Sequence, residues 1–584
     1  MTARNIVPRV NGEGGIGTSA KNWLAGWMKN TYSDNVGVGT TAFGTSASKV
    51  ISIASSAAVA PITSPVDTVQ LWAADYNGAG TTRAYTRTEE NQSAPLATLN
   101  ETAVYYGVSW DESSDTYVRT GRTVGHKTGV TLPVGMLPIQ ESMRGCLVLD
   151  DGTVNYYLCD TDWTKKEDGI TASDLTGTDG QVMVEVPKFW YRYKYLGTTH
   201  TWEVSPVPLT GFKVHEAFKS DSTELNYLYA GAYEGVLYDV SVSAAVAGMY
   251  QTGLSACTFS TTDDSISTSI RTNWATNLVV GQRLIVSGTS NNNGVVTVKS
   301  VESGTKITVN ENLTDETVAG AVVIVTDINV TATTGDKLCS ISGFGAVTGT
   351  VSAGTRAHFR QLAANRGSGW TQEFVDARSA LQLLYLTEYA SFYSQSVIGA
   401  GISNVADWST YNDYNPISKT GMGNGIGVAS GNTGGSTSAA TESTKYMKYR
   451  GIENFYGHLW KWLDGFNINN NIPYICNNPA NFADDTISNY TRPKDVLGAD
   501  ITMINANGYQ STLCKNGRAF MPASIGADGS HKITDYYYQS TGWRVALSGG
   551  HAHDGANDGC FYLHCGYASS ALYRYIAARL YFRK

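Results

Sequence analysis

Short runs in which apolar and polar residues alternate, separated by Gly, Asn and Pro, make up most of the chain. Residues 50–53, 69–72, 181–186 and 189–195 show this pattern, which is typical of strands that bury one face. Pro187 ends one of these runs, because proline cannot donate a hydrogen bond to a sheet. The pattern predicts a chain built mainly from short β-strands.

Two segments favour helices instead. Thr355 is placed to cap a helix over residues 356–365, which Gly367 would close, and Asp376 is placed to cap a helix over residues 377–389. The second helix is apolar on most sides, which predicts that it is buried. The expected fold class is therefore mainly β with some α.

Residues 255–328 differ from the chain around them, because they are rich in Ser, Thr, Val and Asn and poor in aromatic residues. Strands are predicted here over residues 283–286, 295–301, 306–309 and 321–325, with Asn- and Gly-containing turns between them. We expect a self-contained all-β module, Ig-like or a small barrel, inserted into a larger domain.

Composition narrows the class of protein. Only 16% of the 584 residues are charged, whereas 61 are Gly, 35 Tyr and 13 Trp, which fits a β-rich extracellular or virion protein. The net charge is −8 and Lys and Arg form no cluster, so we expect no nucleic-acid partner. The first residues lack the apolar core of a secretion signal. The longest apolar stretches, residues 319–325 and 380–386, are too short to cross a bilayer, so no membrane insertion is expected.

Three passages near the C-terminus resemble a known family. They are residues 457–465 (GHLWKWLDG), 542–550 (GWRVALSGG) and 576–583 (IAARLYFR). They are similar to the G-N-V-W-E-W, R-V-x-R-G-G and G-F-R signatures of the C-type-lectin-like fold. Formylglycine-generating enzymes share this fold with retroelement-diversified phage proteins, the major tropism determinant group. Residues 181–190, 211–218, 364–370 and 381–398 look like phage tail proteins with this domain, and residues 6–21 look like the attachment segment of tail fibres.

The resemblance implies five parts. Residues 1–40 would attach the chain to the virion and oligomerise, and residues 41–103 would form a small β or shaft domain. A C-type-lectin-like α+β domain would follow in two pieces, residues 104–254 and 329–584, on either side of the inserted module at 255–328. Its variable segment would be residues 550–575.

Members of this group carry a stretch before the final strand whose Asn codons are randomised. Such codons cannot yield Lys, Glu, Gln, Met or Trp, and residues 551–575 contain none of these five. Tyr and His suit a binding surface, since each offers an apolar ring with a polar tip and few rotatable bonds. The residues expected to contact a receptor are His551, His553, Asp554, Asp558, His564, Gly566, Tyr567, Leu572, Tyr573 and Tyr575. The alternative is that the tyrosines pack in a core or a subunit contact.

Few residues suggest catalysis or metal binding. No nucleophile elbow, His-Glu-x-x-His or Walker motif occurs, and Cys560 and Cys565 do not reproduce the copper-binding pair of the related enzymes. We expect free thiols, no enzyme and no cofactor. One alternative is a Cys560–Cys565 disulfide, and another is a glycosidase pair among Asp150, Asp151, Glu185 and Glu216. Two metal sites are further alternatives. A zinc ion could bind His551 and His553 with Asp554 and Asp558, and a structural calcium ion could bind Asp464, Asn467, Asn469 and Asn470.

The resemblance implies a phage tail-fibre adhesin, a homotrimer located in the virion. It would bind a host surface protein or glycan through residues 551–575 and a tail or baseplate protein through residues 1–40. The missing secretion signal fits assembly in a host cytoplasm and release by lysis. A bacterial surface-displayed lectin of the same diversified group is one alternative. A glycan-degrading tailspike is another, but it would usually contain a long β-helix with internal repeats, and the sequence has none.

Overall fold

The computed structural model describes residues 105–121, 137–220, 223–248, 250–254, 256–269, 274–320, 322–405, 418–433 and 445–583, together with five short strands between residues 35 and 95. The chain divides into two compact units, Met1–Leu96 and Ala97–Lys584. In the first unit, β1 (Asn35–Val38) pairs in parallel with β2 (Val50–Ile53), and β3 (Gln70–Asp75), β4 (Thr82–Arg87) and β5 (Ser93–Pro95) form an antiparallel sheet. The remainder of the predicted attachment segment 1–40 and shaft domain 41–103 lies outside the described residues.

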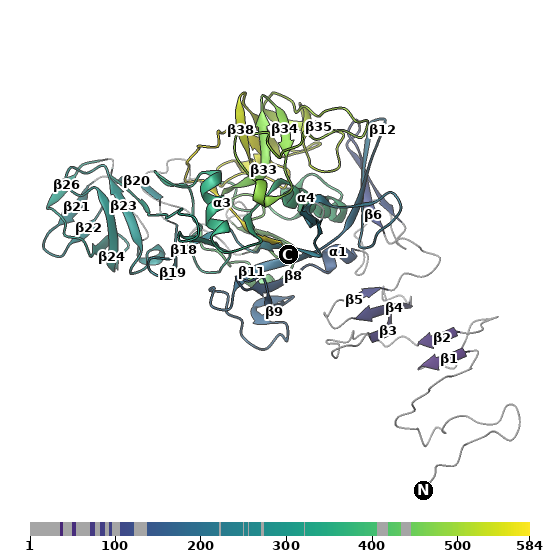
Figure 1. Cartoon of the computed structure of the whole chain (residues 1–584), viewed down its shortest axis with the longest axis horizontal. Helices are drawn as coiled ribbons and strands as arrows, with labels where there is room; N and C mark the ends of the chain where they lie inside the picture. Colours follow the sequence, from purple (N-terminus) through teal and green to yellow (C-terminus); the bar gives the residue numbers. More distant parts are fainter. Residues whose placement is uncertain are drawn as a thin grey trace, which may run out of the picture. The chain divides into compact units, whose positions relative to one another are not determined.

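In the second unit, the sheet that holds the C-terminal strand has seven antiparallel strands (Figure 1). Their order is β10 (Asp162–Lys166), β9 (Val154–Cys159), β8 (Arg144–Val148), β11 (Gln181–Pro187), β17 (Tyr227–Gly231), β41 (Leu580–Arg583) and β29 (Trp370–Gln372). Strand β41 pairs with β17 on one side and β29 on the other. The apolar run at the end of the chain therefore has a strand on each side, so its backbone groups find partners.

Two further large sheets belong to this unit. The five-stranded sheet has the order β14 (Lys213–Val214), β12 (Trp190–Leu196), β13 (Thr199–Ser205), β6 (Tyr106–Asp111) and β7 (Thr116–Gly121). The eight-stranded sheet has the order β34 (Ile472–Ile475), β33 (Trp460–Asn469), β38 (Trp543–Ser548), β39 (Leu563–Cys565), β37 (Tyr536–Gln539), β35 (Gly508–Leu513) and β36 (Pro522–Ile525), and β40 (Ile576–Ala577) pairs with β33 in parallel.

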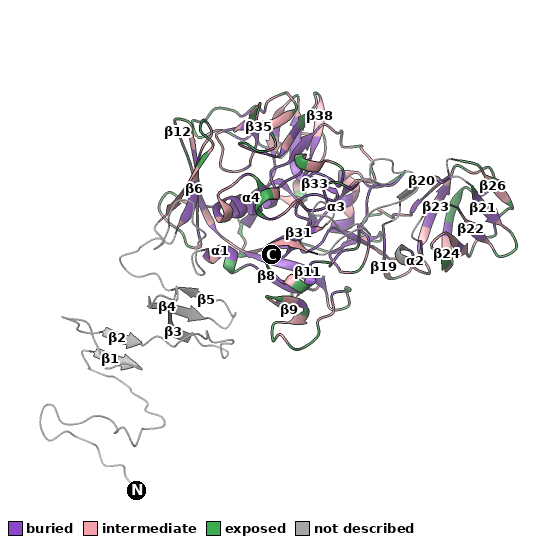
Figure 2. Cartoon of the chain, turned by 180° about the vertical axis from the view of Figure 1, so that it is seen from behind, coloured by how far each residue is buried: buried purple, intermediate pink, exposed green. Residues whose placement is uncertain are grey.

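Helix α4 (Val375–Tyr389) is buried along almost its whole length, because it contacts β6 and β13 of one sheet and β33 of another (Figure 2). The predicted cap at Asp376 is wrong. The helix begins two residues earlier than predicted, with Phe374 at the cap position, and the Asp376 carboxylate instead accepts two hydrogen bonds from Arg518, at 2.7 and 2.8 Å. Helix α3 (Arg356–Ala364) does begin as predicted, with the Thr355 side chain accepting a hydrogen bond from the His358 backbone N–H.

A separate eight-stranded antiparallel sheet spans Tyr250–Thr326 (Figure 1). Its order is β20 (Tyr250–Leu254), β27 (Val322–Thr326), β23 (Arg283–Ser287), β24 (Gly294–Ser303), β25 (Lys306–Val309), β22 (Ser265–Ser267), β21 (Cys257–Ser260) and β26 (Glu316–Val318). Residues such as Phe259, Trp274 and Ile307 form a hydrophobic core distinct from the cores of the other sheets. The domain boundaries given above stay predictions.

The remaining elements are short. They are α1 (Pro138–Glu141), η1 (Glu216–Phe218), β15 (Lys219–Ser220), β16 (Thr223–Glu224), β18 (Val236–Asp239), β19 (Ala244–Val246), α2 (Trp274–Asn277), β28 (Lys337–Cys339), α5 (Ser394–Val397), η3 (Asn424–Ile426), β30 (Gly431–Thr433), β31 (Tyr446–Tyr449), β32 (Ile452–Glu453), η4 (Pro479–Asn481) and η5 (Gly555–Asn557). The predicted fold class, mainly β with some α, is confirmed. Among the described helices, none has the length and apolar character that a bilayer-spanning helix needs. All eight cysteines are free thiols, Cys560 and Cys565 included.

Candidate functional site

The segment expected to contact a receptor leaves the sheet that contains β33 and β38 at Gly549 and Gly550. Both glycines have positive φ angles, +88° and +78°, which other residues rarely adopt. A Cβ atom at Gly550 would also lie 1.6 Å from a carboxylate oxygen of Asp558. These glycines let the chain turn sharply out of β38. It rejoins the same sheet at β39 and again at β40, beside Trp460.

Trp460, the first residue of β33, is the centre of a group of aromatic rings. The imidazole of His551 stacks on its indole, with ring centroids 4.4 Å apart and planes 5° from parallel. His564 of β39 lies 4.9 Å from the indole, and Tyr575 meets it edge-on at 5.3 Å. Trp460, His551 and His564 are all buried. The segment 551–575 therefore packs on a tryptophan that belongs to the sheet.

Four tyrosines cover this buried layer. Tyr538 of β37 stacks on His564 at 4.7 Å, Tyr567 lies 4.9 Å from Tyr573, and Tyr573 stacks on Tyr575 at 5.1 Å. The hydroxyl oxygens of Tyr567 and Tyr575 are 3.2 Å apart. Tyr573 and Tyr538 are 38% and 37% exposed, so the outer rings reach solvent. These seven residues are the Trp460 cluster: Trp460, Tyr538, His551, His564, Tyr567, Tyr573 and Tyr575.

His564 is neutral at pH 7, since burial lowers its pKa to about 4. Its Nδ1 accepts a hydrogen bond from the Gly566 backbone N–H at 3.2 Å, which places the ring proton on Nε2. A neutral imidazole can stack between Tyr538 and Trp460 without the cost of burying a charge.

The other predicted contact residues differ in exposure. His553 is exposed, whereas Gly566 and Leu572 are half-buried. Asp554 is also half-buried, and its Oδ2 lies 3.0 Å from Nδ1 of His551. The structure thus brings five of the ten predicted residues into the Trp460 cluster and places Asp554 against it.

Asp558 does not lie on the surface, which corrects the expectation that it contacts a receptor. Its side chain is fully buried, and neither carboxylate oxygen has a hydrogen-bond partner in the part of the chain that the structure describes. Burial raises the pKa of Asp558 well above its usual range. Burial likewise raises the pKa of Asp535 to about 8, and its Oδ2 accepts a hydrogen bond from the Phe561 N–H at 2.6 Å. Both acids belong to the interior beneath the segment.

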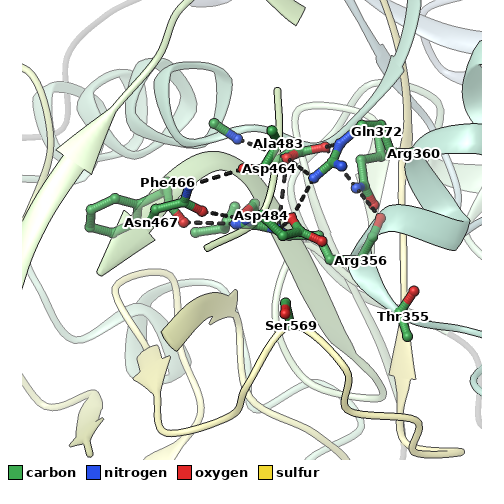
Figure 3. A network of polar contacts seen from close by, with 12 residues as sticks. Thr355, Arg356, Arg360, Gln372, Asp464, Phe466, Asn467, Ala483, Asp484 and Ser569 are labelled. Carbon is green, nitrogen blue, oxygen red and sulfur yellow. Dashed lines mark hydrogen bonds and ion pairs between the residues drawn. The ribbon is translucent and has the colours of Figure 1, made fainter. Parts of the chain in front are cut away.

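A network of arginines and aspartates fixes β33 to helix α3 (Figure 3). Arg360 donates to both carboxylate oxygens of Asp464, at 2.6 and 2.8 Å, and to Asp484 at 2.6 Å. Arg356 also donates to Asp484, at 2.6 Å. The Ser569 hydroxyl, in the predicted segment, donates to Asp485 beside this network. The strand that carries Trp460 is therefore held by paired charges.

Two of the four residues weighed as calcium ligands, Asp464 and Asn467, belong to this network. Asp464 binds Arg360, and the Asn467 side chain accepts from Arg356 and donates to the carbonyl oxygens of Ala483 and Thr486, at 2.9 Å each. Guanidinium groups at both positions disfavour a calcium ion there. Asn469 and Asn470 bond to each other at an exposed turn.

A second buried charge group involves His458 and Lys461, which lie on either side of Trp460 in the sequence. The Glu234 carboxylate contacts Nδ1 of His458 and lies 2.9 Å from Nζ of Lys461. Burial opposes ionisation of Glu234, but these two neighbours outweigh it and lower its pKa to about 2. The sequence offers no signal for this contact, because Glu234 and Lys461 are far apart along the chain.

The structure locates the residues weighed as metal ligands and as a glycosidase pair. In the described ranges, no three His, Cys, Asp or Glu side chains are arranged to hold a metal ion. The acids weighed as a glycosidase pair contact different cations: Asp150 binds Arg366, Glu185 binds Arg144, and Glu216 binds Lys219.

Comparison with known proteins does not assign the chain to a family. No protein-family model matches the chain, and no curated protein matches it.

Proposed function

We propose that this protein is a phage tail-fibre adhesin that binds a host cell-surface molecule through the Trp460 cluster. The observation that supports this most is that four residues selected for their place in the sequence pack on one tryptophan of the sheet: His551, His564, Tyr567 and Tyr575. A fifth, Tyr573, packs on Tyr567 and Tyr575. The host molecule is a protein or a glycan. The working form is a homotrimer in the virion, attached to a tail or baseplate protein through residues 1–40.

The cluster has the physical properties of a recognition surface. Its outer tyrosines are held by ring contacts, so little side-chain entropy is lost when a partner covers them. Tyr538 and Tyr573 are more than one third exposed, and a tyrosine combines an apolar ring with a hydroxyl that can form hydrogen bonds to a partner. A fixed sheet that carries an adaptable surface is a common way to separate stability from binding.

The test measures binding of the labelled full-length protein to a panel of bacterial strains. A double variant, Tyr538→Ala with Tyr573→Ala, should reduce binding to a recognised strain at least about tenfold, because central aromatic residues carry much of a binding free energy. Tyr393→Ala is the matched control, since Tyr393 is 37% exposed and lies outside the cluster. Equal binding by the double variant and the control would refute the assignment of the surface.

A further inference from the structure

A cavity of about 310 Å³ opens between the five-stranded sheet and two loops of the C-terminal half. Strands β12 and β14 form one wall, and residues 494–496 and 516–518 form the other. The lining combines three rings with four cations and one acid: Tyr191, Tyr193, Phe212, Arg192, Lys213, Lys494, Arg518 and Asp495. No lining residue belongs to the Trp460 cluster, so the cavity is a separate feature of the domain.

The cations of this cavity are not equivalent. Arg518 donates two hydrogen bonds to the buried Asp376, and Arg192 donates to Glu203 at 2.7 Å. Lys494 lies 3.1 Å from a carboxylate oxygen of Asp500. Lys213 forms no ion pair with any acidic side chain of the described residues, although it lines the cavity. Its positive charge is the one in this lining that an incoming anion would neutralise most favourably.

Tyr191 supplies a second unsatisfied group. Its side chain is 1% exposed, and its hydroxyl has no hydrogen-bond partner among the residues that the structure describes. Nζ of Lys213 lies 5.1 Å from the centre of the Tyr191 ring. A buried hydroxyl normally finds a partner, and because Tyr191 lines the cavity beside Lys213, a bound ligand would supply the missing acceptor.

The ring surfaces of the cavity are kept close by a glycine. A Cβ atom at Gly517 would lie 2.3 Å from Cβ of Tyr193 and 3.2 Å from the Tyr191 ring. On the other side, the Arg192 guanidinium lies 4.4 Å from the centre of the Phe212 ring. The lining therefore offers apolar faces together with a small number of polar groups, as ligand sites generally do.

We propose that this cavity binds an acidic sugar unit, a saccharide ring that carries a carboxylate or phosphate group. Lys213 pairs with the acidic group, the Tyr191 hydroxyl donates to a sugar oxygen, and the aromatic rings pack against the apolar face of the ring. The inference does not depend on the proposed adhesin function.

A larger cavity of about 520 Å³ lacks these features, although it also contains cations. There Arg366 donates to the Leu338 carbonyl at 2.9 Å and to Asp150, and Lys337 lies 3.4 Å from the same Asp150 carboxylate. Because its charges are already paired, it has no equivalent of Lys213 to attract an anion.

The experiment titrates the full chain with glucuronic acid, glucose 6-phosphate, glucose and inorganic phosphate by calorimetry, with saturation-transfer NMR for weak binding. Both acidic sugars should bind, and glucose and phosphate should bind at least about tenfold more weakly. Lys213→Gln should weaken glucuronic acid binding about tenfold, because a hydrogen bond to a charged group is lost. Tyr191→Phe should weaken it less. Lys299→Gln, at an exposed lysine of β24, should leave it unchanged.

Each contrary outcome overturns a defined part of the inference. Equal binding of glucose and glucuronic acid removes the role of the charge, and unchanged affinity in Lys213→Gln removes the assigned site. Phosphate binding as tight as that of the acidic sugars reduces the cavity to a simple anion site. Cell binding by the Trp460 cluster variants reports on the adhesin proposal separately, because those variants leave this cavity intact.

Discussion

The imidazole of His551 lies parallel to the indole of Trp460, with ring centroids 4.4 Å apart. His551 belongs to the segment that the family resemblance implies is variable, whereas Trp460 begins β33, a strand buried in the sheet that also contains β38. Stacking is tolerant of the ring placed on the indole, since Tyr, His or Phe can each present a flat face. A fixed tryptophan can therefore support several different residues at position 551.

We expect Trp460, on which the other rings pack, to contribute more to folding stability than the partly exposed Tyr573. Trp460→Ala should lower the free energy of unfolding by about 3–5 kcal/mol, because it leaves a cavity under three rings. Tyr573→Ala should change it by less than about 1 kcal/mol, since the side chain is partly exposed. Urea denaturation of the two variants tests this. Similar losses in both would mean that Tyr573 is a core residue.

The extent to which the sequence predicted these features depends on how local each one is. The Thr355 cap was predictable because its hydrogen bond spans three residues. The Asp376 cap was not, because Arg518, distant in sequence, captures that carboxylate. The family resemblance, together with the residue types that its randomised codons allow, pointed to the tyrosines of residues 551–575. Tyr538 was missed, since it joins them only through the pairing of β37 with β39.

The arginine–aspartate network should be required for folding stability. Asp464→Ala should cost about 3–5 kcal/mol, because it leaves Arg360 without its buried partner. Asp263→Ala is the control, since Asp263 pairs with Lys306 where both side chains are about 40% exposed, and it should cost less than about 1 kcal/mol. Thermal denaturation compares them. A cost for Asp464→Ala no greater than that for the control would contradict a supporting role.

Asp535 should make stability fall as pH rises. Its pKa is raised to about 8 in the folded state, against about 4 in an unfolded chain, so only the folded state holds the proton between these values. The stabilisation is complete below about pH 4 and is lost as the pH approaches 8. Asp535→Asn mimics the protonated acid and should remove a slope worth a few kcal/mol. Urea denaturation from pH 5 to 8 measures it, with the exposed Asp315→Asn as control. An unchanged slope would show that Asp535 ionises freely.

Diversification predicts a pattern in the DNA as well as in the protein. If the segment is rewritten from a template, a near-repeat of its last codons lies near the gene, with Asn codons at positions 551, 553, 564 and 575, beside a reverse transcriptase gene. Related copies should then vary at His551 and Tyr575 but keep Trp460, because the indole supports whichever ring is placed on it. The buried position of Asp558 predicts that it varies less than exposed His553. Sequencing the flanking DNA decides this: with no near-repeat there, the aromatic surface would be a fixed binding site.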